Sequence, residues 1–321
     1  MTGAAGFIGR HVVNACVRAG HDVTALDLRP ATPELASSVR WVRTDCNSKH
    51  LLAEVARGHY SAVLHQAAIS DTRVPDGARL HEVNTLTPLR IAFACRMGGA
   101  RFVYASSHAV YGRLHRHEPI PESADDDRSR CSGPLNPYAR SKLALDRQMR
   151  ALHVSGLRWV GLRYTNVVGA DELDKGPTAS ILSQLLRDAA TTGHVHVFSD
   201  TLTAARDYVP VEVVASTVEL LATTRIPAGV YNLGAGYAVS FAQVLEWCAS
   251  LRHGTGQNRL DVRLIPNTFA AAYQYYTCAD MTALNHALPE RQRVGAHDVE
   301  SCATHLFDLF HHKMTTGLDR P

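Results

Sequence analysis

Tyr138 and Lys142 form a pair that could act on a hydroxyl group. They lie four residues apart, so on a helix both side chains share one face. There the lysine ammonium can lower the pKa of the phenol and hold a ribose hydroxyl. A tyrosine and a lysine at this spacing also occur on ordinary solvated helix faces, so their surroundings must decide between the two interpretations.

Ser107 supplies a second hydroxyl at the end of a predicted strand, in the run Y-A-S-S-H-A-V-Y-G over residues 104–112. Ligands of parallel α/β folds bind at the carboxyl ends of the strands. Ser107 and Tyr138 could together hydrogen-bond one substrate oxygen while hydride leaves its carbon. The alternative for Ser106 and Ser107 is simple capping of a loop.

A glycine-rich loop at the start of the sequence predicts a dinucleotide cofactor. Gly3, Gly6 and Gly9 form a G-x-x-G-x-x-G fingerprint that leads through Phe7 and Ile8 into a predicted helix. Glycines allow a tight turn and a close approach of the backbone to a pyrophosphate, whose charge is stabilised at the helix N-terminus. We therefore expect these five residues to bind the cofactor.

The strand that normally precedes such a loop is missing, because only Met1 and Thr2 stand before Gly3. That strand is central in a doubly wound sheet, and without it two neighbours would expose unpaired N–H and C=O groups. We expect the natural protein to begin several residues upstream, with Met1 read from a Val-type start codon within the strand. We also expect a structure of this chain to lack the central strand or to show strain there.

Asp27 ends the next predicted strand and favours NAD as the cofactor. Its carboxylate can accept hydrogen bonds from ribose hydroxyls and would repel a 2′-phosphate. Arg29, two residues later, could instead neutralise that phosphate, so NADP is the alternative. The other predicted cofactor-binding residues, besides Tyr138 and Lys142, are Asp45, Cys46, Gln66, Ala67, Ala68 and Asn84.

Strand and helix patterns alternate along the first half of the sequence, which predicts a Rossmann-like, doubly wound parallel α/β sheet with helices on both faces. The predicted strands cover 22–27, 38–45, 61–68, 101–105 and 158–162, and the predicted helices cover 11–19, 50–57, 80–97 and a segment from 137 onward. Residues 206–222 look like a strand and a helix that return to this sheet. The predicted dinucleotide-binding domain is 1–165 with 206–232, and the smaller substrate lobe is 166–205 with 233–321.

Composition excludes several classes of function. A net charge of +3 over 321 residues is too weak to indicate nucleic acid, and no window approaches the roughly 18 apolar residues of a membrane span. The seven cysteines form no C-x-x-C motif, and no histidine spacing is typical of zinc. We expect a cytoplasmic protein with reduced thiols, no metal, and neither a nucleic-acid nor a membrane partner.

Together these motifs resemble those of the extended short-chain dehydrogenase/reductase family, the nucleotide-sugar epimerases and dehydratases. The similar segments span essentially the whole chain and read T-G-A-A-G-F-I-G, H-Q-A-A, S-S-H-A-V-Y-G, Y-A-R-S-K, L-R-Y-T-N-V-V-G, R-D-Y-V and Y-N-L-G-A-G. The resemblance implies that Ser107 and Tyr138 act on the reacting oxygen. It also implies that Lys142 supports Tyr138 and the nicotinamide ribose, that Asn166 contacts a nucleotide-sugar substrate, and that the protein is a homo-oligomer.

His108 and Ala109 stand where dehydratases of this family carry an Asp-Glu pair, so dehydration is not expected. His108 is a candidate substrate contact. The alternative is a histidine that is merely hydrogen-bonded in a partly buried turn.

Within the family, the sequence is more similar to the epimerases that act at carbon 6 of ADP-glycero-manno-heptose. The shared residues are Pro134-Leu135-Asn136, Lys175-Gly176, Phe198, Arg206-Asp207 and Tyr273-Gln274. This resemblance implicates Lys175 as a second acid/base. An alcohol is epimerised by oxidation to a ketone, rotation, and hydride return to the other face, after which the oxygen lies near a different proton donor. The alternative for Lys175 is an exposed loop lysine.

Arg206 is expected to bind the diphosphate of the substrate, because a guanidinium matches phosphate oxygens bidentately. Its alternative is a salt bridge with Asp207 or with another acid. Tyr273 could close over the same diphosphate or could simply pack, and Phe198 completes the predicted substrate site. The function predicted is inversion of carbon 6 of an ADP- or GDP-heptose. The alternatives are a carbon-4 epimerase, which needs no Lys175, and a non-catalytic NAD(P)-binding protein.

Overall fold

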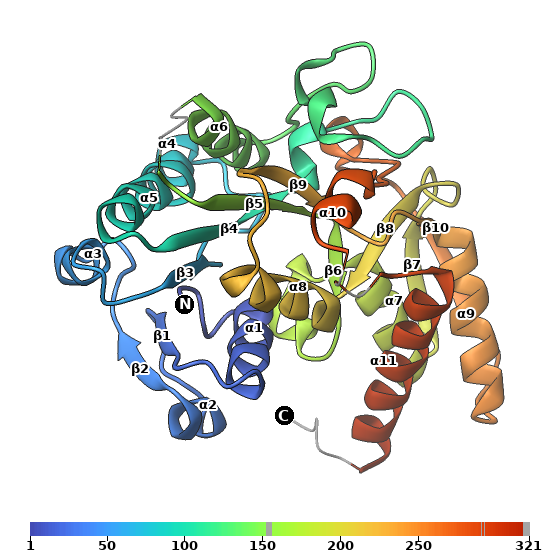
Figure 1. The fold of residues 1–321 in the computed structure, drawn as a ribbon. Coiled ribbons are helices and arrows are strands. Elements are labelled where there is room, and N and C mark those ends of the chain that lie inside the picture. The colour runs from blue at the N-terminus through green and yellow to red at the C-terminus, as the bar shows by residue number, and fades with distance from the viewer. Residues whose placement is uncertain (152–155, 290, 292, 317–321) are drawn as a thin grey trace.

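The computed structural model describes residues 1–151, 156–289, 291 and 293–316. Residues 152–155 of the predicted dinucleotide-binding domain and residues 290, 292 and 317–321 of the predicted substrate lobe lie outside the described part. Its main sheet is parallel and has the strand order β2-β1 followed by β3-β4-β5-β9 (Figure 1). The strands are β1 (Thr24–Asp27), β2 (Arg40–Arg43), β3 (Ala62–His65), β4 (Arg101–Ser107), β5 (Trp159–Tyr164) and β9 (Gly229–Leu233).

Met1 and Thr2 connect the two halves of the main sheet. Thr2 forms parallel bridges to both β1 and β3, and its backbone bonds to Leu64 and Gln66 at 3.0 and 3.1 Å. The Thr2 hydroxyl lies 2.8 Å from Nδ1 of His65. Among the described residues no strand lies between β1 and β3, in agreement with the expectation that the central strand is missing from this chain.

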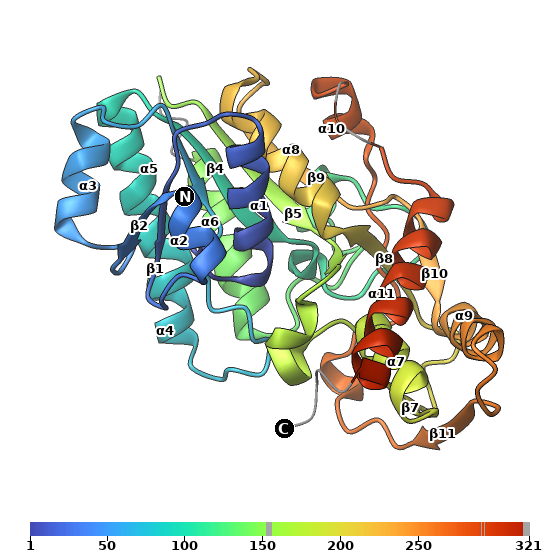
Figure 2. The same ribbon diagram turned by 90° about the horizontal axis from the view of Figure 1, so that it is seen from below.

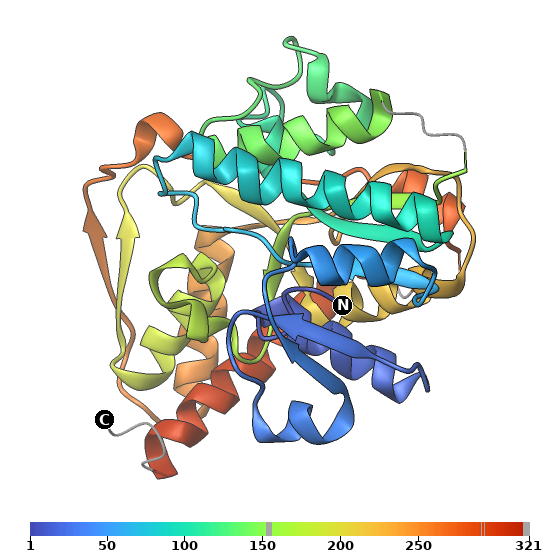
Figure 3. The same ribbon diagram turned by 90° about the vertical axis from the view of Figure 1, so that its left-hand side faces the viewer.

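Helices cover both faces of the main sheet, as predicted. Helices α3, α5 and α6 pack on one face, and α1 and α8 pack on the other (Figures 1 and 3). The helices of this part are α1 (Phe7–Arg18), α2 (Pro33–Ser38), α3 (Lys49–Ala56), α4 (Gly77–His81), α5 (Thr87–Gly98), α6 (Pro137–Ala151) and α8 (Val211–Thr223). Three short turns complete it: the π turn η1 (Glu82–Leu86) and the 3-10 turns η2 (His108–Tyr111) and η3 (Glu122–Asp126).

Two predicted elements need correction. The helix predicted over 80–97 is divided into α4, η1 and α5, because Asn84 in η1 bonds to the backbone of Ile69 and to the hydroxyl of Ser141. The strand predicted from residue 206 does not join the main sheet. It is β8 (Ala205–Pro210), which pairs with β6 (Asn166–Val168) and β10 (Ala238–Ser240) in a separate three-stranded sheet. The elements that return to the main sheet are α8 and β9.

A second hydrophobic core lies beside the main sheet, where helices α7, α9 and α11 pack together with the parallel pair β7-β11 (Figure 2). Leu186, Val244 and Phe307 are fully buried in it. The remaining elements are η4 (Glu172–Thr178), α7 (Ile181–Thr191), β7 (His194–Phe198), α9 (Phe241–Gly254), β11 (Asp261–Ile265), η5 (Ala270–Ala272), α10 (Thr282–Ala287) and α11 (Ala296–Thr316). No helix in the described part of the chain has the length and apolarity needed to cross a membrane.

Candidate active site

Strand β4 delivers Ser107 to the carboxyl end of the main sheet, where the chain turns into η2. The Ser107 hydroxyl accepts a hydrogen bond from the N–H of Ala109 at 3.1 Å, so it caps this turn. The side chain of Tyr138, at the start of α6, lies close enough to this hydroxyl to interact with it. The structure therefore brings the predicted pair together, although Ser107 also has the capping contact that was its alternative interpretation.

Lys142 lies one turn after Tyr138 and donates a hydrogen bond to the Ala105 carbonyl at 2.8 Å. Its ammonium is 6.0 Å from the centroid of the Tyr138 ring. The residue is 2% exposed, so the pair does not lie on a solvated helix face. Burial lowers the pKa of Lys142 to about 8, an effect that the nearby Asp146 opposes. Burial also raises the pKa of Tyr138, an effect that the interaction with Ser107 opposes.

Asp146, one further turn along α6, belongs to a buried ionic network that sequence reasoning missed. Its carboxylate accepts hydrogen bonds from Nε of Arg163 at 2.8 Å and from the hydroxyls of Tyr104 and Ser106 at 3.1 and 2.9 Å. Asp146 and Arg163 are both fully buried. The available signal was the helical spacing, which puts Asp146 on the same face as Lys142.

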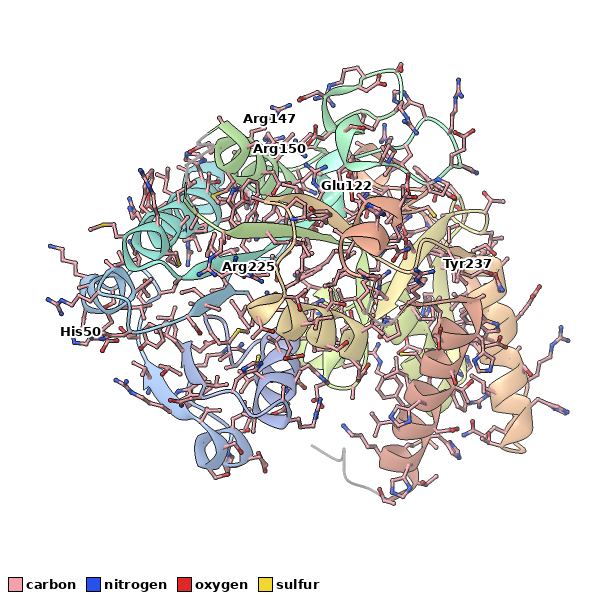
Figure 4. The ribbon with its side chains drawn as sticks, in the orientation of Figure 1. His50, Glu122, Arg147, Arg150, Arg225 and Tyr237 are labelled. Carbon is pink, nitrogen blue, oxygen red and sulfur yellow. The ribbon has the colours of Figure 1, made fainter. Side chains whose placement is uncertain are left out.

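The network continues from Arg163 to Asp125 in η3. Arg150 of α6 also pairs with Asp125, at 2.6 Å. Burial would raise the pKa of Asp125, but the two guanidinium groups hold it below its ordinary value. Figure 4 shows Arg147 and Arg150 on α6 beside the segment that carries Glu122. This network fixes α6 against β4, β5 and η3, and thereby fixes the helix that carries Tyr138 and Lys142.

The glycine-rich loop has the close packing that a dinucleotide site requires. Gly3 has a positive φ of 71°, and a Cβ on it would lie 2.6 Å from the backbone nitrogen of Ala67. A Cβ on Gly9 would lie 1.9 Å from the Gly3 carbonyl oxygen. Gly6 is the N-cap of α1 and no side chain caps the helix, which starts at Phe7. The N–H groups of its first turn are thus free to bind phosphate, and the loop fits the predicted cofactor.

Asp27 and Arg29 lie side by side at the rim of this loop. The Asp27 carboxylate accepts hydrogen bonds from the N–H groups of Ala5 and Arg29, each at 3.0 Å. The Arg29 Nε atom is 3.5 Å from the same carboxylate, and its side chain is largely exposed. The acid that favours NAD is therefore anchored by the backbone of the loop itself.

Gln66 presents an unused hydrogen-bond donor next to the small residues Ala67 and Ala68. Its amide oxygen accepts a bond from the Tyr164 hydroxyl at 3.0 Å. Its amide nitrogen is buried, and no described residue accepts a bond from it. A cofactor could satisfy this donor.

Three other predicted cofactor residues have contacts within the fold. Asn84 uses its amide to hold Ile69 and Ser141. Asp45 accepts a hydrogen bond from the N–H of Asn47 at 2.8 Å. Cys46 is half-buried, and burial raises the pKa of its thiol to about 12. These contacts belong to the fold itself. Binding of the cofactor by these three residues stays a prediction.

Arg206 lies on β8 close to two aromatic rings. Its guanidinium carbon is 5.1 Å from the centroid of the Tyr273 ring and 5.6 Å from that of Phe241. Tyr273 in turn lies edge-on against Phe198, with ring centroids 5.9 Å apart. Arg206 is 8% exposed, and its guanidinium donates a hydrogen bond to the carbonyl of Ala205 at 3.3 Å.

The alternative partner of Arg206, Asp207, is engaged elsewhere. Its carboxylate accepts hydrogen bonds from the N–H groups of Ala235, Gly236 and Ala279 at 2.7–3.1 Å. Burial raises the pKa of Asp207 to about 6, and these backbone donors oppose the rise. No carboxylate of the described residues forms an ion pair with Arg206, so its buried charge is available to an anion.

Lys175, in η4, is placed beside the first turn of α1. Its ammonium lies 5.5 Å from the centroid of the Phe7 ring and 3.5 Å from a carboxylate oxygen of the buried Glu172. The side chain is one-third exposed. Within the described residues no contact joins Lys175 to Ser107 or Tyr138, so its predicted catalytic role stays a prediction.

Two further predicted substrate contacts are used by the fold. The Asn166 amide donates hydrogen bonds to the Asp207 carbonyl and the Thr277 hydroxyl at 3.0 and 3.3 Å. The His108 ring is 2% exposed, with Nε2 3.4 Å from the Cys278 carbonyl oxygen. Burial lowers the pKa of His108 to about 4, so the ring is neutral at pH 7. The structure thus has the hydrogen-bonded histidine that was the alternative to a substrate contact.

No group of His, Cys, Asp or Glu side chains in the described ranges could hold a metal ion.

Comparisons with known proteins place this chain in a family. The sequence profile of the NAD dependent epimerase/dehydratase family matches residues 1–234. An ADP-L-glycero-D-manno-heptose-6-epimerase from Pseudomonas aeruginosa is 31% identical over 310 residues, which cover 89% of this chain and 92% of that protein.

Two solved structures are similar along nearly the whole chain. The ADP-L-glycero-D-manno-heptose-6-epimerase of Helicobacter pylori has a TM-score of 0.81 at 26% identity, covering 97% of this chain and 95% of its own. The UDP-glucose 4-epimerase of Thermus thermophilus, solved with NAD, has a TM-score of 0.76 at 27% identity, covering 96% and 97%. The predicted Rossmann-like fold, the epimerase class and the choice of NAD are confirmed. The chain belongs to the NAD-dependent epimerase/dehydratase family of enzymes.

Proposed function

We propose that this enzyme inverts carbon 6 of an ADP- or GDP-glycero-manno-heptose. The observation that carries the proposal is Arg206, a buried guanidinium beside Tyr273 that no described carboxylate neutralises. A buried charge without a partner destabilises a fold, whereas a diphosphate would satisfy it bidentately. The heptose epimerases among the relatives support this choice of sugar.

The proposed chemistry begins at Tyr138 and Ser107. Tyr138 takes the proton of the sugar hydroxyl, and Ser107 holds the same oxygen. Lys142 keeps a positive charge beside Tyr138, which favours the phenolate. A bound NAD would supply the hydride acceptor and donor that this oxidation and re-reduction need. The glycine-rich loop, Asp27 and Gln66 are the residues proposed to hold this cofactor.

Lys175 is proposed to serve as the second acid/base, after rotation of the ketone has turned its oxygen away from Tyr138. Its position on η4 supports this role, because η4 lies against the first turn of α1, where the cofactor loop ends. The proposed homo-oligomer agrees with the family resemblance. The proposed cytoplasmic location agrees with the seven free cysteines.

A carbon-4 epimerase is the second candidate, favoured by the similarity to UDP-glucose 4-epimerase. It would use Ser107, Tyr138 and Lys142 in the same way. Incubation of the enzyme with ADP- and GDP-heptoses and with UDP-hexoses, followed by NMR of the products, separates the two. Inversion at carbon 6 supports the proposal; inversion at carbon 4 alone would replace it with the second candidate.

A further inference from the structure

Arg113 clamps a distant segment of the chain through its guanidinium group. Nη2 donates hydrogen bonds to the carbonyls of Ala270 and Ala271 at 2.8 and 2.6 Å, and Nε donates to that of Tyr273 at 3.3 Å. The amide of Gln274 returns a bond to the carbonyl of Gly112 at 2.6 Å. Four hydrogen bonds thus join residues 112–113 to residues 270–274.

The clamped segment, residues 267–276, is here called the strap. A second anchor, Asp200, holds both ends of the strap. The Asp200 carboxylate accepts hydrogen bonds from the Tyr275 hydroxyl at 2.6 Å and from the Asn267 amide at 3.1 Å. The strap is therefore fixed at two places, by Asp200 after β7 and by Arg113 after η2.

Tyr273 lies within the part of the strap that Arg113 holds, and its ring lies near Arg206. The centroid of its ring is 5.1 Å from the guanidinium carbon. The strap has little helical structure of its own, since η5 is a single short turn. Its backbone position, and with it the position of the Tyr273 ring, depends on the side chains that hold its carbonyls.

We propose that Arg113 is a positioning residue for the diphosphate site, acting by holding the strap so that Tyr273 stays over Arg206. The proposal rests on the proposed nucleotide-sugar site. Arg113 follows Ser107 by six residues, with η2 between them. The same short segment therefore carries the hydroxyl that meets the sugar and the guanidinium that orders the diphosphate end of the site.

The test measures binding of ADP, UDP and GDP by calorimetry to the NAD-loaded enzyme. We expect Arg113→Ala to raise the Kd of the nucleoside diphosphate that the wild type binds by about ten-fold, the size of one lost hydrogen bond to a charged group. The affinity for NAD should not change. Arg116→Ala is the matched control, because Arg116 is exposed three residues further along the same loop. It should leave both affinities as they are.

A double-mutant cycle tests whether Arg113 acts through Tyr273. In a Tyr273→Ala background, Arg113→Ala should weaken binding by no more than about two-fold. A full ten-fold loss there, no loss in the single variant, or a parallel loss of NAD affinity would each overturn the proposal. If Arg113→Ala does not fold, Arg113→Lys replaces it in the same measurements. A lysine reaches fewer carbonyls than an arginine, so we expect a smaller loss of affinity for the nucleoside diphosphate, and the same outcomes would overturn the proposal. A wild type that binds none of the three diphosphates would instead overturn the proposed nucleotide-sugar site.

Discussion

Lys142 is a buried cation that the proposed reaction needs. Its pKa of about 8 lies below the ordinary 10.5, so the buried charge lowers the free energy of unfolding at neutral pH. This penalty disappears as the pH rises from about 8 to 10.5. We expect Lys142→Met to abolish epimerisation and to raise the free energy of unfolding at pH 7 by about 1–3 kcal/mol. Chemical denaturation and turnover assays measure the two effects.

Lys49→Met is the matched control for that substitution, because Lys49 is the exposed first residue of α3. It should change the free energy of unfolding by less than about 0.5 kcal/mol and leave activity intact. The stability of the wild type relative to that of Lys142→Met should rise between pH 8 and pH 10.5, because other titrating groups act equally in both proteins. A Lys142→Met variant less stable than the wild type at pH 7 would contradict this explanation.

Lys175 distinguishes the two candidate reactions. If it is the second acid/base, Lys175→Ala should lower kcat at carbon 6 by about 10²–10⁴-fold, the usual contribution of a general acid or base. KM should change little. Lys313→Ala, on α11, is the control and should retain full activity. If steady-state kinetics show that Lys175→Ala keeps the wild-type kcat, Lys175 is not an acid/base and only forms an ion pair with Glu172.

Local spacing explains which of these residues could be predicted from the sequence. The glycine-rich loop and the pair Tyr138 and Lys142 each lie within one turn or loop, so their geometry follows from the sequence. The role of Arg113 could not be predicted from local spacing, because the carbonyls to which it donates hydrogen bonds are 157–160 residues away in the sequence. The sequence places Arg163 in the motif L-R-Y-T-N-V-V-G but does not predict its ion pairs, because its partners come from α6 and η3.

At the scale of elements, the Arg163 network holds α6, the helix that carries Tyr138 and Lys142, in place. Arg163→Met would leave Asp146 and Asp125 buried with one cation fewer, so we expect the free energy of unfolding to fall by about 3–5 kcal/mol. Arg147→Met is the matched control, because Arg147 pairs with the exposed Asp126 next to the same network and should lose at most about 1 kcal/mol. Equal losses in the two variants, measured by urea denaturation, would show that the buried network does not stabilise α6.

Most elements of the main sheet could be predicted because buried parallel strands and amphipathic helices have local hydrophobic patterns. The π turn η1 could not, since it depends on contacts that Asn84 makes with Ile69 and Ser141. The position of β8 was also beyond the sequence. A buried strand shows the same pattern in any sheet, and its partners β6 and β10 are set by tertiary packing.

For the whole molecule, the residues proposed to act on the sugar and to hold the cofactor lie in one part of the fold, and those proposed to bind the diphosphate lie in another. The glycine-rich loop and the Ser107–Tyr138–Lys142 group belong to the main sheet and its helices. Tyr273 instead packs against the second core, and Arg206 lies near Phe241 of that core. The division into a dinucleotide-binding domain and a substrate lobe stays a prediction, and so does the homo-oligomer.

The most direct test of the proposed function uses ADP-D-glycero-D-manno-heptose with deuterium at carbon 6. Internal removal and return of the same hydrogen by the enzyme's bound NAD should give a product that is inverted at carbon 6 and still carries the deuterium there, as read by NMR in ordinary water. An unchanged configuration at carbon 6, or an inverted product that has exchanged its deuterium with solvent, would contradict the proposed reaction.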